Sequence, residues 1–175
     1  MPKPYLLVVT GRPGSGKTTL AVDLGNHLRM PVISRDQIKE GYVHTLGKKH
    51  SGLPADTNKV VTDIFFDTVH GLLCNNVSVI IEAAFQHNVW SVYLERFKGI
   101  AQMHLLICRL DDSVAQKRFS ERSLKDPSRE YFHGDDTGTG VYEEPRLDIP
   151  AIYVDTLGKY NPSVEELGKM ILKYR

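Results

Sequence analysis

The stretch that decides the fold lies near the N-terminus, where residues 11–18 read GRPGSGKT and follow the apolar run YLLVV at residues 5–9. The octet has the spacing G-x-x-x-x-G-K-[ST] of a phosphate-binding loop (P-loop), and residues 19–24 after it read as a helix. A buried strand, a glycine-rich loop and a helix are the context that this motif requires. The octet therefore predicts a binding site for a nucleoside triphosphate with Mg²⁺.

Each residue type in the loop has a chemical reason. Glycines let the backbone curl, so that successive N–H groups point at phosphate oxygens near the positive end of the following helix. We expect Lys17 to reach the β- and γ-phosphates and the Thr18 hydroxyl to bind Mg²⁺, while Pro13 stiffens the loop. The expected ATP contacts in this segment are Gly11, Pro13, Gly14, Ser15, Gly16, Lys17, Thr18 and Thr19. No N-K-x-D motif for reading guanine occurs, which favours ATP over GTP.

Apolar strand segments alternate with helical segments along the rest of the chain. Further strands are expected at residues 31–34, 77–81, 103–108 and 151–154. Helices are expected to open near residues 36, 56, 113 and 163, and residues 125–149 read as one long irregular segment. This alternation predicts an α/β fold of three layers, a P-loop NTPase fold whose five-stranded parallel sheet carries helices on both faces. Ligands of such sheets bind at the carboxyl ends of the strands.

Length and composition limit the classes of protein to consider. The chain has 175 residues, 41% hydrophobic and 25% charged, which suits a single domain over residues 1–175. Its formal net charge of +1 provides no basic footprint, so an extended nucleic acid is an unlikely partner.

Targeting signals and cysteines give the expected location. No apolar run approaches the roughly 20 residues that span a membrane, and the N-terminus lacks a cleavable signal pattern, so we expect a cytoplasmic protein without a membrane partner. Cys74 and Cys108 lie in apolar surroundings and are expected to be buried, reduced thiols. The oligomeric state is left open.

Two carboxylates follow predicted strands and are candidates for chemistry. Asp36 comes just after the second strand, where it could accept a proton from an attacking hydroxyl. The alternative for Asp36 is a plain helix N-cap, and the two roles are compatible. Glu82 closes the third strand, the position of the second acidic motif of P-loop proteins, and would hold Mg²⁺ through a bound water. The alternative for Glu82 is an acidic residue at a solvated strand end.

A basic helix provides candidate cations for the transferred phosphoryl group. The helix that starts near Ser113, after the acidic residues Asp111 and Asp112, carries Arg118 and Arg122 one turn apart on one face. A basic segment that leads into an irregular stretch suits a lid over the triphosphate, at about residues 118–140, with its arginines neutralising charge in the transition state. The alternative is a solvated helix face.

With these residues identified, the chain resembles small P-loop kinases. Residues 33–36 (ISRD) resemble the strand-end aspartate segment of polynucleotide 5′-hydroxyl kinases. Residues 36–41 (DQIKEG) and 137–145 (TGTGVYEEP) resemble the D-x-[IV]-[RK]-x-G and T-G-x-x-x-x-Y-E-x-P segments of adenylylsulfate kinases. Chloramphenicol phosphotransferases and zeta-toxin-type kinases share the general layout.

The resemblance implies roles for several residues. Asp36 would be the general base, and the basic residues near it, Arg35 and Lys39, would contact the acceptor. Arg118 would lie against the adenine and Arg122 near the phosphates, so that Lys17, Asp36 and Arg122 form the catalytic set. The segment after the fifth strand, Asp155 and Thr156, would help to form the adenine pocket.

Three functions are consistent with this pattern. The first is an ATP-dependent kinase that transfers the γ-phosphoryl group to a hydroxyl of a small molecule or nucleotide. The second is a polynucleotide 5′-hydroxyl kinase; residues 35–59 hold five cations and three anions, which suits a small anionic acceptor or a strand end but not an extended phosphate track. The third belongs to another class, a nucleotide-switched ATPase that regulates a binding partner.

Overall fold

Five parallel strands form one sheet in the computed structural model, which describes residues 2–85, 87–134 and 142–172. In chain order the strands are β1 (Tyr5–Thr10), β2 (Val32–Ser34), β3 (Val79–Glu82), β4 (Gln102–Arg109) and β5 (Ala151–Asp155). Their order across the sheet is β2-β3-β1-β4-β5, and every neighbouring pair is parallel. The predicted five-stranded parallel sheet is therefore confirmed, with β1 and its phosphate-binding loop at the centre.

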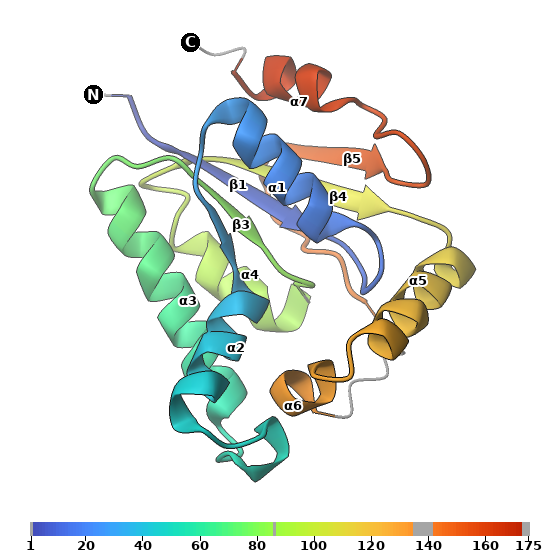
Figure 1. The fold of residues 1–175 in the computed structure, drawn as a ribbon. Helices are drawn as coiled ribbons and strands as arrows, with labels where there is room; N and C mark the ends of the chain where they lie inside the picture. Colours follow the sequence, from blue (N-terminus) through green and yellow to red (C-terminus); the bar gives the residue numbers. More distant parts are fainter. Residues whose placement is uncertain (1, 86, 135–141, 173–175) are drawn as a thin grey trace.

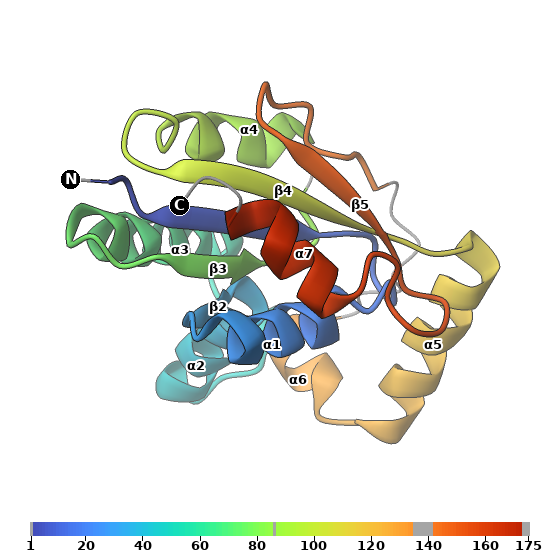
Figure 2. The same cartoon turned by 90° about the horizontal axis from the view of Figure 1, so that it is seen from above.

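Helices cover both faces of the sheet, as predicted (Figures 1 and 2). Helices α1 (Lys17–Leu28) and α7 (Val164–Ile171) pack on one face, and α3 (Thr57–Cys74) and α4 (His87–Glu95) on the other. Alternate residues of β1 face opposite layers, so that Leu6 and Val8 join one hydrophobic cluster and Leu7 and Val9 the other. Because both faces are covered, all six β1 residues are buried, which explains the unbroken apolar run.

The remaining helices lie at the carboxyl ends of the strands. These are α2 (Arg35–Leu46), α5 (Asp112–Lys125), α6 (Arg129–His133) and the short 3₁₀ helix η1 (His50–Gly52). Figure 1 shows α2, α5 and α6 grouped at the end of the sheet to which the strand arrows point. They therefore surround the edge where a ligand of a parallel sheet binds.

Helix caps follow the sequence signals in two of three cases. The Asp111 carboxylate accepts hydrogen bonds from the N–H groups of Ser113 and Val114 at the start of α5. Ser163 and Glu166 form the predicted capping box of α7. Asp36, however, is not the N-cap of α2, because Ser34 occupies that position and Asp36 lies in the first turn.

Two α-helices, α4 and α6, were not predicted. Helix α4 has only nine residues, and its exposed Val89 and Val92 obscure the helical apolar pattern of the buried Trp90 and Leu94. Helix α6 lies inside the segment that was expected to be irregular over residues 125–149. Its five residues span little more than one helical turn, too short for a periodic pattern to show.

One of the two cysteine predictions was wrong. Cys108 is buried as expected, and burial raises the pKa of its thiol to about 12. Cys74 is exposed in the last turn of α3, with its Sγ 3.4 Å from Nε2 of His70. The buried face of α3 runs through Phe66, Val69 and Leu73, so the residue after Leu73 turns away from the core. In the described part of the chain, no helix is long and apolar enough to cross a membrane.

Candidate active site

A buried carboxylate connects the phosphate-binding loop to the second strand. Glu82, at the end of β3, is only 2% exposed and accepts hydrogen bonds from the hydroxyls of Thr18 (3.1 Å) and Ser34 (2.9 Å). Nζ of Lys17 lies 3.9 Å from the same carboxylate. Burial raises the pKa of Glu82, an effect that the Lys17 charge and the two hydroxyls oppose. Glu82 is therefore not at a solvated strand end, and these contacts leave it beside the loop that would hold the triphosphate.

The residues around Glu82 fit a magnesium ion bound with a nucleotide. Thr18 and Glu82 provide a hydroxyl and a carboxylate oxygen in contact with each other, and oxygen atoms are the ligands that Mg²⁺ prefers. Within the described ranges, no group of three or more histidine, cysteine, aspartate or glutamate side chains could hold a metal. P-loop kinases bind Mg²⁺ with a few protein oxygens together with phosphate oxygens and water.

The loop itself has the geometry of a phosphate cradle. Gly14 and Gly16 both have φ of 81°, in the left-handed region that favours glycine. The buried Ser15 hydroxyl has no hydrogen-bond partner in the protein, although buried polar groups are normally paired. A loop of left-handed glycines with an unpartnered hydroxyl suits an anion that accepts hydrogen bonds.

The three residues expected near the adenine lie together on the β5 side of this loop. The guanidinium of Arg118 donates to the carbonyls of Thr156 (3.2 Å) and Leu157 (3.1 Å). The Thr156 hydroxyl donates to the carbonyl of Ser15 at 2.7 Å, so the segment after β5 is attached to the phosphate-binding loop. The Asp155 carboxylate accepts from the N–H of Leu157 and shapes the turn.

The remaining predicted site residues surround a second, smaller space, which we call the acceptor cavity after the role that the sequence predicts for Arg35 and Lys39. It has a volume of about 160 Å³. Its lining contains Pro13, Lys17, Arg35, Asp36, Lys39, Ala83, Ala84, Trp90, Arg122, Arg129 and His133. The structure thus brings the proposed catalytic set of Lys17, Asp36 and Arg122 to one cavity, although they are far apart in sequence.

Five residues of this lining were missed, the alanines Ala83 and Ala84 and three residues with larger side chains, Trp90, Arg129 and His133. Trp90 lies under the guanidinium of Arg35, 5.7 Å from the ring centre, and it comes from the helix that the sequence did not reveal. Nε2 of His133 lies 2.8 Å from Oε1 of Glu40 and joins α6 to α2. Arg129 belonged to the basic run of the predicted lid, a signal that could have identified it.

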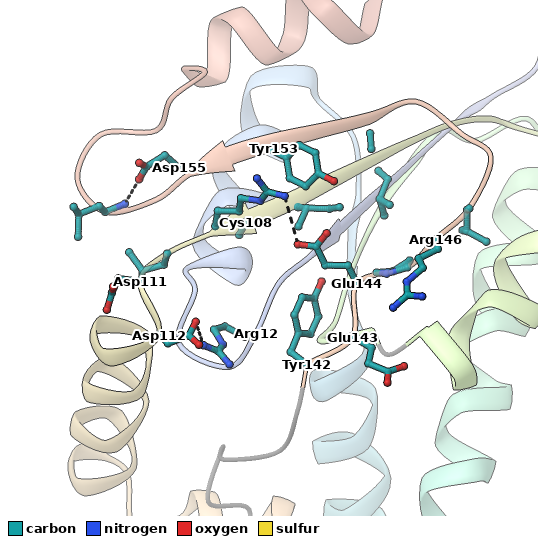
Figure 3. Close-up of a pocket in the computed structure, with 18 residues that line it drawn as sticks. Arg12, Cys108, Asp111, Asp112, Tyr142, Glu143, Glu144, Arg146, Tyr153 and Asp155 are labelled. Carbon is teal, nitrogen blue, oxygen red and sulfur yellow. Dashed lines mark hydrogen bonds and ion pairs between the residues drawn. The ribbon is translucent and has the colours of Figure 1, made fainter.

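A larger hollow, of about 1160 Å³, lies over β4 and β5 (Figure 3). Only Arg12 from the phosphate-binding loop lines it, and the figure shows Arg12 beside Asp112 at one end and Arg146 at the other. Several of its charged groups are already paired, since Arg12 contacts Asp112 and Arg109 contacts Glu144. Lys17 of the loop and Asp36 line the smaller cavity and not this hollow.

Residues 142–145, from the second segment that resembles adenylylsulfate kinases, form part of the wall of this hollow. The Tyr142 hydroxyl lies 3.1 Å from Oγ1 of Thr10, which also accepts from the N–H of Phe85. Burial raises the pKa of Tyr142 to about 12, so this phenol stays protonated at neutral pH. Residues 137–141 of the same motif and residues 135–140 of the predicted lid lie outside the described residues.

The comparisons with known proteins agree with this fold. Residues 6–137 match an AAA domain family, AAA_33. Among solved structures, a protein of Chloroflexus aurantiacus j-10-fl assigned as a kinase is 23% identical, with a TM-score of 0.83 and 99% of each chain covered. None of the curated proteins matches the sequence.

Two further structures come from enzymes with different acceptors. A gluconokinase from Sinorhizobium meliloti 1021 is 19% identical, with a TM-score of 0.56 over 99% of this chain and 92% of that one. The Mycobacterium tuberculosis APS kinase, solved with AMPPNP and APS, is 15% identical, with a TM-score of 0.64 over 99% of this chain and 98% of that one. At identities this low, the likeness shows a shared fold and not a shared reaction. The chain belongs to the AAA domain family AAA_33 and has the fold of small P-loop kinases.

Proposed function

We propose that this protein is an ATP-dependent kinase that transfers the γ-phosphoryl group of ATP to a hydroxyl of a small molecule or nucleotide. The observation that carries the proposal is the shared cavity of Lys17, Asp36 and Arg122. Phosphoryl transfer to a hydroxyl needs a lysine from the phosphate-binding loop, a carboxylate and an arginine. Here the carboxylate comes from α2 and the arginine from α5. A nucleotide-switched ATPase would not require the carboxylate on the acceptor side.

The transfer can be written with these residues. The acceptor hydroxyl gives its proton to the Asp36 carboxylate while its oxygen forms a bond to the γ-phosphorus and the bond to the β–γ bridging oxygen breaks. ADP leaves with the bridging oxygen. Lys17 and Arg122 neutralise the charge that builds up on the phosphate oxygens. Asp36 is suited to proton transfer because its side chain is 47% exposed and can reach a bound acceptor.

The other predicted residues serve the binding of the donor. Thr18 and Glu82 would hold Mg²⁺, Glu82 through a bound water, and the ion would supply positive charge to the β- and γ-phosphates. We propose that Arg118 covers one face of the adenine and that the segment at Asp155 and Thr156 lines its edge. The hydrogen bonds from Arg118 to the carbonyls of this segment support that assignment.

A screen with radiolabelled ATP tests the proposal. Nucleosides, 5′-hydroxyl oligonucleotides, sugars and sugar acids, and antibiotics would be incubated with the protein, and labelled product and ADP would be measured. We expect transfer to a small acceptor, and we expect Asp36→Asn to keep ATP affinity while losing at least about 10²-fold in transfer. Asp67→Asn, an exposed aspartate on α3, is the matched control and should behave as the wild type.

Two outcomes would contradict the proposal. ADP production that no acceptor changes would favour the nucleotide-switched module. A fully active Asp36→Asn variant would exclude Asp36 as the base.

A further inference from the structure

The acceptor cavity carries an excess of positive charge. Its described lining holds five side chains of lysine and arginine and a single carboxylate, that of Asp36. Lys17 and Arg122 are already assigned to the transferred phosphoryl group. The other three cations, Arg35, Lys39 and Arg129, come from α2 and α6. A neutral acceptor would offer these side chains no group of opposite charge.

Arg35 is held in place more firmly than a surface arginine. Its side chain is only 14% exposed, its guanidinium lies over Trp90, and Nη2 donates to the backbone and side-chain oxygens of Asn58 at 3.3 and 3.2 Å. Oδ1 of Asp36 lies 3.9 Å from its Nη1. Its Nε is buried and has no hydrogen-bond partner. A desolvated guanidinium that lines a cavity is suited to bind an anion.

The other two cations strengthen this site. Nε of Arg129 is also buried without a partner, and its guanidinium carbon lies 5.2 Å from the ring centre of Phe119. Lys39 is 5% exposed and lines the same cavity. Burial lowers the pKa of Arg35, which reflects the cost of removing its charge from water. An anionic ligand would offset that cost.

We propose, on the basis of the kinase function proposed above, that the acceptor is a small hydroxylated molecule that also carries a phosphate or carboxylate group, which Arg35 binds together with Lys39 and Arg129. Such an acceptor must approach the triphosphate, and like charges in a partly desolvated cavity repel strongly unless cations lie between them. The cavity volume of about 160 Å³ is below the usual range for drug-sized ligands, about 300–1,000 Å³, so the portion of the acceptor inside it is small.

Matched pairs of acceptors test the proposal. The probes are sorbitol, gluconate and sorbitol 6-phosphate, and uridine with uridine 3′-monophosphate, so that carboxylate and phosphate are compared with a neutral counterpart. Transfer from labelled ATP gives kcat/KM, and calorimetry on the protein saturated with Mg²⁺-AMPPNP gives binding without transfer. For the preferred anionic compound of each set, we expect kcat/KM and binding affinity both to be roughly ten- to hundredfold higher than for the neutral compound.

Substitutions of Arg35 connect this preference to the residue. Arg35→Gln should raise the KM of the anionic acceptor roughly ten- to hundredfold and leave the KM for ATP nearly unchanged, while Arg35→Lys should restore part of the loss. Arg96→Gln is the matched control, because Arg96 also lies over an aromatic ring, that of Tyr93 at 5.4 Å, but does not line the cavity. Retained binding of Mg²⁺-AMPPNP shows that each variant is folded.

The outcomes separate this inference from the proposed function. Equal transfer to neutral and anionic acceptors would support the kinase and overturn the anion site. The same conclusion would follow if Arg35→Gln reduced transfer to neutral and anionic acceptors equally. Anion binding that depends on Arg35, without transfer to any probe, would retain the anion site and contradict the kinase. If none of the anionic probes binds, the anion site is wrong.

Discussion

At the scale of single residues, the magnesium-binding role proposed for Glu82 conflicts with stability. Its carboxylate is 2% exposed, and its principal partners are two hydroxyls and one lysine at 3.9 Å. A carboxylate so placed is costly to ionise, yet a charged oxygen is what Mg²⁺ requires. Sites that bind charged ligands commonly carry such destabilised groups.

The first prediction concerns how the contribution of Glu82 to stability changes with pH. Because burial raises the pKa of Glu82 above its ordinary value of 4.5, the folded protein holds this proton more tightly than the unfolded chain does. The contribution of Glu82 to stability is therefore fully present below that ordinary pKa and is lost as pH rises through the raised pKa. In Glu82→Gln this loss is absent, so the free energy of unfolding of the variant should improve relative to the wild type between about pH 4 and about pH 8.

Denaturant unfolding of both proteins at the two pH values measures this difference. The same variant should lose phosphoryl transfer, because an amide cannot replace the charge beside Mg²⁺. A relative stability that falls with rising pH would mean that attraction to Lys17 outweighs the burial of Glu82.

At the scale of elements, the phosphate-binding loop and α5 are in direct contact at Gly14. A methyl group at this position would overlap the backbone carbonyl of Ala115 on α5. Gly14 is thus required for two separate reasons, its φ of 81° and the close approach of a helix. Since α5 carries Arg118 and Arg122, this contact sets the position of the arginines relative to the loop.

The second prediction concerns this contact. Gly14→Ala should lower the free energy of unfolding by at least about 2 kcal/mol, because the left-handed backbone is strained and α5 must move. In a chain of this length that loss corresponds to a fall in Tm of roughly 4–8 °C, measured by calorimetry. Gly71→Ala on α3, where a methyl group meets nothing, is the control and should gain up to about 1 kcal/mol. Equal effects of the two variants would show that α5 does not constrain the loop.

At the scale of the whole molecule, the sheet could be predicted because each strand is a short apolar run in an alternating pattern. The positions of the loop residues, Asp36 and Glu82 could be predicted, though not their roles, because these residues follow strands, and strand ends of a parallel sheet lie at one edge. Trp90 could not, because it reaches the cavity from a nine-residue helix with two exposed valines. The burial of Arg35 could not be predicted either, because it depends on contacts with Asn58 and Trp90, which are distant in sequence.

The last prediction concerns the phosphate-binding loop as the centre of the molecule. It connects β1 to α1, contacts α5 through Gly14 and holds the segment after β5 through the Ser15 carbonyl. A ligand bound there should therefore stabilise the entire fold. Mg²⁺-AMPPNP at one hundred times its Kd should add about 2.7 kcal/mol and raise Tm by roughly 5–10 °C.

Differential scanning fluorimetry with matched variants tests which contacts carry this stabilisation. Lys17→Ala should abolish the shift because it removes the charge that reaches the phosphates, and chelation of Mg²⁺ should reduce it in the wild type. Asp36→Asn should keep the full shift, since Asp36 faces the acceptor and not the donor phosphates in our proposal. A shift that persists in Lys17→Ala would mean that the nucleotide binds elsewhere, and the large hollow over β4 and β5 would then be the place to search.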